Sequence, residues 1–199
     1  REDALSLRIH ASSALVPNAA VISPVVRVHL VHPELGSPVR PSGEATTPMQ
    51  TAPFDMTRRR AATFAAEWQE TLEVEEALGD VLGARAVALF EVLQLPPSFT
   101  YYEERSASFP GGQPMRVAWG FLKLLRGSDG KPNMGRLKVQ LYRWDDRVGI
   151  LGLGGAAAVD AAADAPEVFK EWKRALQVAP SLRRLYPAHL DVTVASSPR

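Results

Sequence analysis

The 199-residue chain contains no cysteine. It therefore has no disulfide framework, no thiol nucleophile and no thiolate metal site, and it fits a reducing, cytoplasmic location. The chain also lacks a large excess of charge of either sign. It has 23 basic and 22 acidic residues, and its formal net charge is +1. A nucleic-acid-binding surface must neutralise many phosphates, so this balance argues against nucleic acid as a partner.

Long hydrophobic runs are absent as well. No stretch approaches the ~18 uninterrupted apolar residues that a membrane-spanning helix needs, and the N-terminus does not have the pattern of a signal peptide. The chain begins with Arg1 and not with methionine, so we expect it to be part of a longer protein. Apolar residues make up 46% of the chain, a typical value for a globular protein, and we expect one domain over residues 1–199.

Apolar and polar residues alternate along much of the chain, which is the period of a strand with one buried face. The alternating segments are 5–10, 25–31, 68–74, 136–144 and 190–194. Segment 86–95 is apolar almost throughout, which indicates a central strand buried on both faces, and segment 115–125 is again strongly apolar. About seven or eight strands of this kind, without a long internal repeat, predict an all-β, antiparallel β-sandwich.

Three segments interrupt the strand pattern. Residues 33–66, the Pro-rich insertion, contain five prolines and cannot hold a continuous ladder, because proline lacks the N–H group. Residues 149–163 are rich in glycine and alanine and predict a loop. Residues 164–177 predict one inserted α-helix, since Asp164 can cap its N-terminus and Pro166 suits its first turn.

Catalytic and metal-binding motifs are hard to find. The histidines are His10, His29, His32 and His189. On a strand His29 and His32 would point to opposite faces, so they could not chelate one metal ion without a bend. We interpret the histidines as strand-face residues that are solvated or hydrogen-bonded. Segment 152–157 matches a dinucleotide fingerprint superficially, but no acidic residue follows at the required distance. We therefore predict no enzyme activity, no cofactor and no metal ion.

Charged residues gather in two places. An acidic group lies around Leu72 and consists of Glu67, Glu70, Glu73, Glu75 and Glu76. Of these, Glu67, Glu73 and Glu75 are expected on the solvent face of the strand. A basic group surrounds one predicted hairpin and consists of Arg126, Lys131, Arg136 and Lys138. These four are candidate contacts for an anionic lipid head group or an acidic partner, and ordinary solubility is the alternative interpretation.

Several strings resemble the C2 domain family, whose members are eight-stranded β-sandwiches. The strings are Trp68-x-Glu70-x-Leu72-x-Val74, Ala88-x-Phe90-x-Val92 and Ser23-Pro24-Val25-Val26-Arg27-Val28. Calcium-binding members have aspartate where this chain has Ser23, and an Asp-x-Asp pair where it has Gln94 and Pro96. Calcium requires six to eight oxygen ligands, several of them carboxylates. The resemblance therefore implies a calcium-independent C2-like domain.

A more specific resemblance is to the jouberin family. It rests on the order of strings at 24–31, 118–125, 137–142 and 186–194, and it covers the chain from Leu5 to Val194. It implies a non-enzymatic scaffold module at the ciliary base, that is, the transition zone and basal body, where the partners are other ciliary proteins. It also implies a WD40 propeller after Arg199.

A second hypothesis is a peripheral C2 module that binds anionic phospholipid. It is motivated by the four basic residues of the predicted hairpin and by three apolar residues placed in predicted loops, Phe99, Ile150 and Leu151.

Overall fold

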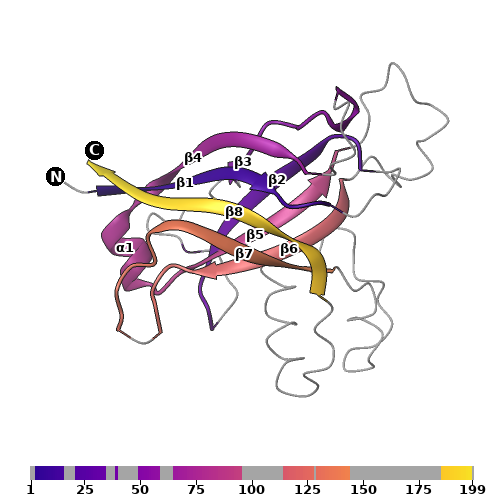
Figure 1. Ribbon diagram of the computed structural model, residues 1–199. Helices are drawn as coiled ribbons and strands as arrows, with labels where there is room; N and C mark the ends of the chain where they lie inside the picture. Colours follow the sequence, from indigo (N-terminus) through magenta and orange to yellow (C-terminus); the bar gives the residue numbers. More distant parts are fainter. Residues whose placement is uncertain are drawn as a thin grey trace.

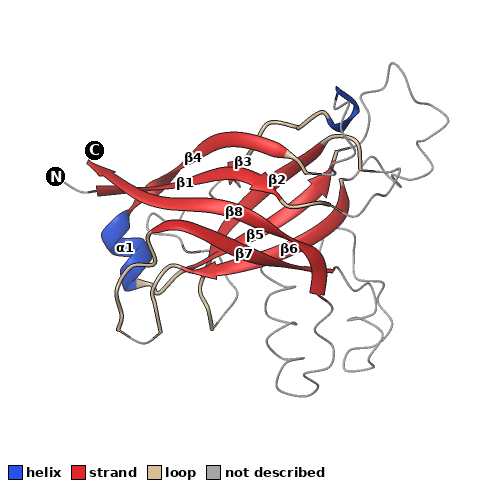
Figure 2. Cartoon of the chain, viewed as in Figure 1, coloured by secondary structure: helices blue, strands red, loops and turns tan. Residues whose placement is uncertain are grey.

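The computed structural model describes residues 3–15, 21–34, 39, 49–58, 65–95, 114–127, 129–143 and 185–198. Over these residues the chain forms eight strands, one α-helix and one 3-10 turn (Figures 1 and 2). The strands are β1 (Asp3–Ser12), β2 (Pro24–Val31), β3 (Met49–Gln50), β4 (Glu67–Ala77), β5 (Val87–Gln94), β6 (Met115–Lys123), β7 (Gly135–Arg143) and β8 (Leu185–Pro198). The helical segments are η1 (Met56–Arg58) and α1 (Leu78–Gly83).

The strands form one antiparallel sheet in the order β3-β2-β5-β6-β7-β8-β1-β4. The sheet folds over on itself, because β6 and β7 pair only through Ala118–Gly120 and Leu141–Arg143 and then separate. One half, β3-β2-β5-β6, therefore packs on the other half, β7-β8-β1-β4. The first and last strands meet in the second half, where Asp3 lies opposite Pro198 and the two strands run side by side (Figure 1). The predicted all-β antiparallel sandwich of about eight strands is confirmed.

The core lies between the two halves and draws on alternate residues of each. Leu7 and Ile9 of β1 and Leu190 of β8 pack in one cluster with Val28 of β2 and Phe90 of β5. Each of these five side chains is at most 1% exposed. Every residue of β5 is buried, as the continuous apolar run predicted for a central strand. Along β1 and β2, the apolar positions of the alternating sequence pattern are therefore the side chains that face the core.

Gly120 permits the close approach of β6 and β7 at the fold of the sheet. A Cβ atom on this residue would lie 2.7 Å from the backbone carbonyl oxygen of Gln140 and 3.1 Å from the side chain of Val139. A carbon atom cannot sit that close to a backbone oxygen, so any larger residue would push the two strands apart. Glycine in the middle of a strand marks a close approach of another backbone.

The two outer edges of the sheet are joined through side chains instead of a ladder. The indole Nε1 of Trp68 in β4 donates a hydrogen bond to the carbonyl oxygen of Pro24 in β2, at 3.1 Å. The carboxylate of Glu70 accepts one from the backbone N–H of Ala52, at 2.8 Å. Within the described part of the Pro-rich insertion, only the two residues of β3 join the sheet. Residues 35–38, 40–48 and 59–64 of the insertion lie outside the described residues.

The helix α1 was not expected from the sequence. It connects β4 to β5 at one end of the sandwich (Figure 2), and its Leu78, Val81 and Leu82 pack against the core at helical spacing. Six residues are too few to show a period reliably, which is why sequence reasoning missed it. The predicted helix 164–177 and the predicted loop 149–163 lie outside the described residues. In the described part of the chain, no helix is long and apolar enough to span a membrane.

Candidate functional site

The four basic residues singled out in the sequence are all exposed, but they lie in two different settings. Arg126 and Lys131 belong to the connection between β6 and β7, where the N–H of Arg126 donates to the carbonyl oxygen of Lys131 at 2.9 Å. Arg136 and Lys138 lie two residues apart on β7 and share its outward face. The structure thus splits the group into a hairpin pair and a sheet-face pair.

The sheet-face pair is extended by Arg8, which sequence reasoning did not connect with it. Thr193 of β8 lies opposite Arg136 of β7 on one side and opposite Arg8 of β1 on the other. Side chains directly opposite each other on neighbouring antiparallel strands have Cβ atoms about 4.5–5.5 Å apart. The two arginines are therefore in the same cross-strand row, on either side of one threonine.

We call this surface the β7–β8–β1 face. It is defined by the outward side chains of Arg136 and Lys138 from β7, Asp191 and Thr193 from β8, and Arg8 and His10 from β1.

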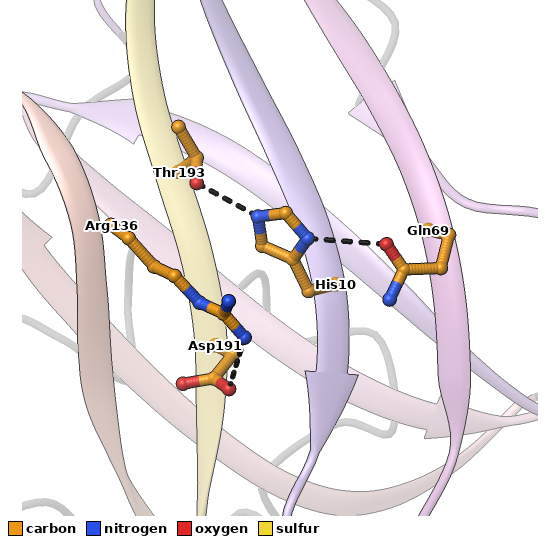
Figure 3. Close-up of polar contacts among 5 residues, drawn as sticks. All are labelled: His10, Gln69, Arg136, Asp191 and Thr193. Atoms are coloured by element: carbon orange, nitrogen blue, oxygen red, sulfur yellow. Dashed lines mark hydrogen bonds and ion pairs between the residues drawn. The ribbon is translucent and has the colours of Figure 1, made fainter.

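Two contacts order the face (Figure 3). The guanidinium of Arg136 reaches across β8 and donates to the carboxylate of Asp191 at 3.1 Å, and the two side chains are 66% and 23% exposed. An ion pair this exposed contributes little to stability, because water screens it. Asp191 also lies opposite Lys138 in the β7–β8 register. One carboxylate thus stands beside two cations, and the face remains positive.

The second contact is a bridge made by His10. Its Nε2 is hydrogen-bonded to the hydroxyl of Thr193 at 2.8 Å, and its Nδ1 donates to the amide oxygen of Gln69 at 3.2 Å (Figure 3). The register shifts on both sides of His10, toward β8 and toward β4, and Gln69 adopts a φ of 53°. Bulges of this kind re-aim side chains, and here the ring lies between Thr193 of β8 and Gln69 of β4 (Figure 3). The interpretation of His10 as a hydrogen-bonded strand-face histidine is confirmed.

A second region of interest is the loop that precedes β2. The amide oxygen of Gln94 accepts hydrogen bonds from the backbone N–H groups of Ile22, at 2.7 Å, and Ser23, at 2.8 Å. The amide nitrogen of Gln94 donates to the carbonyl oxygen of Leu95 at 2.7 Å. Gln94 is only 3% exposed. Its side chain therefore fastens the loop to the end of β5, and the oxygen that would face a cation already has two protein donors.

Replacing Gln94 with alanine tests this role. We expect Gln94→Ala to lower the free energy of unfolding by about 2 kcal/mol, because it leaves two backbone N–H groups without acceptors. Amide hydrogen exchange at Ile22 and Ser23 should accelerate more than exchange in β1. Gln50→Ala is the matched control, since the Gln50 side chain at the short strand β3 accepts from the Arg27 side chain and from no backbone N–H group of the described residues. Unchanged exchange at Ile22 and Ser23 would contradict the assignment.

A buried histidine–carboxylate hydrogen bond lies on the other half of the sandwich. The imidazole Nε2 of His29 lies 2.8 Å from a carboxylate oxygen of Glu91, and the side chains are 11% and 4% exposed. Trp119 is opposite Glu91 in the β5–β6 register, and its ring packs against Phe121 and Tyr142. Glu91 is thus buried beside an aromatic group with one histidine as its partner.

The acidic residues of β4 that the structure describes lie in different settings. Glu67 and Glu73 are exposed, whereas Trp68, Leu72 and Val74 pack toward the core, as predicted. Glu70 instead supports the sheet edge through Ala52.

Metal-binding clusters are equally lacking in the parts of the chain that the structure describes. There, no three His, Asp or Glu side chains are placed to hold a metal ion. Of the residues cited for calcium and membrane binding, Pro96, Phe99, Ile150 and Leu151 lie outside the described residues.

A scan against protein-family models and a search of curated proteins found no match.

Proposed function

We propose that this chain is a non-enzymatic, C2-like protein-interaction module of a jouberin-like protein, acting at the ciliary base in cilium assembly. Its location is cytoplasmic, at the transition zone and basal body, and its partners are other proteins of that region. The proposal rests on the order of the strings that resemble the jouberin family. Three of them, at 118–125, 137–142 and 186–194, fall largely on the consecutive strands β6, β7 and β8 of one sandwich.

The nature of the candidate surfaces supports an interaction module. The β7–β8–β1 face is exposed, polar and hydrogen-bonded, which suits recognition of another molecule. The loop at Ser23 is held by the Gln94 amide, which suits a C2-like domain that works without calcium.

Affinity capture tests the proposal. The chain, carried on a resin, is exposed to lysate from ciliated cells and from the same cells before ciliation. We expect transition-zone and basal-body proteins to be enriched on the chain relative to a resin carrying an unrelated β-sandwich. Capture profiles that match the unrelated sandwich would contradict the proposal.

A second candidate function is calcium-independent binding to anionic phospholipid. It is favoured by Arg126 and Lys131, which are exposed at the connection between β6 and β7. There they could contact lipid head groups while the strands of the sandwich stay away from the bilayer. Flotation with phosphatidylcholine vesicles, with and without phosphatidylserine, tests it. Binding should require phosphatidylserine, weaken as salt rises and fall in Arg126→Gln/Lys131→Gln. No flotation at low salt would eliminate this candidate.

A further inference from the structure

The β7–β8–β1 face concentrates positive charge around one hydroxyl group. Arg8 and Arg136 flank Thr193 in one cross-strand row, and Lys138 lies on the same side of β7 as Arg136. The side chain of Arg136 extends over β8 to the carboxylate of Asp191 (Figure 3). An anion above Thr193 would lie between the two strand positions that carry guanidinium groups.

The charge of the face matches a phosphate monoester. Arg8, Arg136 and Lys138 supply three cations, and Asp191 is the one carboxylate among the residues that define the face. Among the described residues, neither Arg8 nor Lys138 makes an ion pair. Two positive charges remain, and a phosphorylated side chain carries about −1.5 to −2 at neutral pH.

The type of cation also matters. A guanidinium presents several N–H groups in a plane and can donate two parallel hydrogen bonds to a phosphate, whereas a lysine acts as a point charge. Two arginines around one hydroxyl are suited to a tetrahedral anion with several oxygens. The bridge from Gln69 through His10 to Thr193 holds the centre of the face in place.

The surroundings of the face favour a peptide over a membrane. The neighbouring outward residues Ser6, Thr71 and Gln140 are polar, and the exposed carboxylate of Glu73 lies on β4 opposite Ser6. Among the described residues, the exposed large hydrophobic side chain is Leu185, at 59%. It is eight residues from Thr193 along β8, which corresponds to about 26 Å of extended strand. Within the described ranges, no exposed large apolar side chain therefore lies beside the cations to enter a bilayer.

We propose that the β7–β8–β1 face binds a phosphorylated serine, threonine or tyrosine of a partner protein, with Arg8 and Arg136 holding the phosphate. Lys138 and the hydroxyl of Thr193 complete the site. This inference rests on the proposed function as an interaction module, and it supplies the chemistry by which a partner is recognised. It also makes the interaction controllable by a kinase, since the unmodified partner lacks the anion.

Titration of the isotope-labelled chain with small peptides tests the inference. The probe is a capped pentapeptide of glycine and alanine with a central phosphoserine, and the controls carry serine or glutamate at that place. The phosphopeptide should shift the backbone amide resonances of Arg8, Arg136 and Thr193 saturably, and the shifts should shrink as salt rises. Arg8→Gln and Arg136→Gln should each weaken binding about fivefold, the upper range for an exposed charge contact.

The matched control is Lys123→Gln, which removes an exposed cation from the end of β6 and should leave the phosphopeptide affinity unchanged. Well-dispersed spectra will show that each variant is folded. The inference is overturned if the glutamate peptide binds as well as the phosphopeptide, or if Arg8→Gln and Arg136→Gln bind normally. It is also overturned if phosphatidylserine vesicles shift these resonances and the phosphopeptide does not.

The two proposals can fail separately. Capture of transition-zone proteins by both the wild-type chain and Arg8→Gln/Arg136→Gln would keep the proposed function and reject the phosphate site. Binding of the phosphopeptide without capture of any transition-zone protein would keep the site and reject the ciliary role.

Discussion

Replacing Phe90 with alanine should lower the free energy of unfolding by about 3–5 kcal/mol, the range for removing a fully buried aromatic side chain. Phe90 is 0% exposed in the core between the two halves of the sandwich. It lies on the central strand β5, opposite Val28 of β2 and Gly120 of β6. Because hydrogen-bonded strands hold it on both sides, the site cannot collapse to fill the space, and the cost should be near the top of that range.

Equilibrium unfolding in urea measures this effect. Leu185→Ala is the matched control, because it also shortens an apolar side chain but at a position that is 59% exposed. Its effect should stay within about 0.5 kcal/mol. A loss below about 1.5 kcal/mol for Phe90→Ala would mean that the two halves do not pack on this residue.

Replacing His29 with alanine should cost about 2–4 kcal/mol, because it leaves the Glu91 carboxylate buried without its donor. The loss of packing around a side chain that is 11% exposed is the smaller part of this effect. Glu91→Gln should cost less, since an amide in the same place can still hydrogen-bond the imidazole. The measurement is again the free energy of unfolding.

A double-mutant cycle separates the pair from its surroundings. His29→Ala/Glu91→Ala should be less destabilising than the sum of the two single variants, with a coupling of about 0.5–3 kcal/mol. Strictly additive losses would show that the two side chains act independently, in conflict with the 2.8 Å contact.

The sequence predicted the strands best where burial of each side chain determines whether the residue is apolar or polar. Alternation located β1, β2, β4, β7 and β8, and the continuous apolar run located β5, because each residue of a strand faces either the core or its opposite side. The end of a strand carries less signal: β8 extends from Leu185 to Pro198, while only residues 190–194 were predicted. Ala195, Ser196 and Ser197 near its end are all exposed and show no apolar–polar alternation.

The candidate sites were less predictable because they depend on which strands are neighbours. Arg8 and Arg136 are far apart in sequence. They lie in one cross-strand row only because β8 lies between β1 and β7. Nothing in either local pattern specifies that order. The same holds for Gln94, whose partners Ile22 and Ser23 precede β2. His29 was correctly assigned to a strand face, but its buried partner Glu91 lies on another strand.

The location of the chain in ciliated cells tests the central claim most directly. The chain is fused to a fluorescent protein and expressed while cilia are assembled, with the fluorescent protein alone as the reference. The proposed function predicts that the fusion concentrates at the ciliary base, beside basal-body markers. A distribution identical to that of the fluorescent protein alone would contradict it.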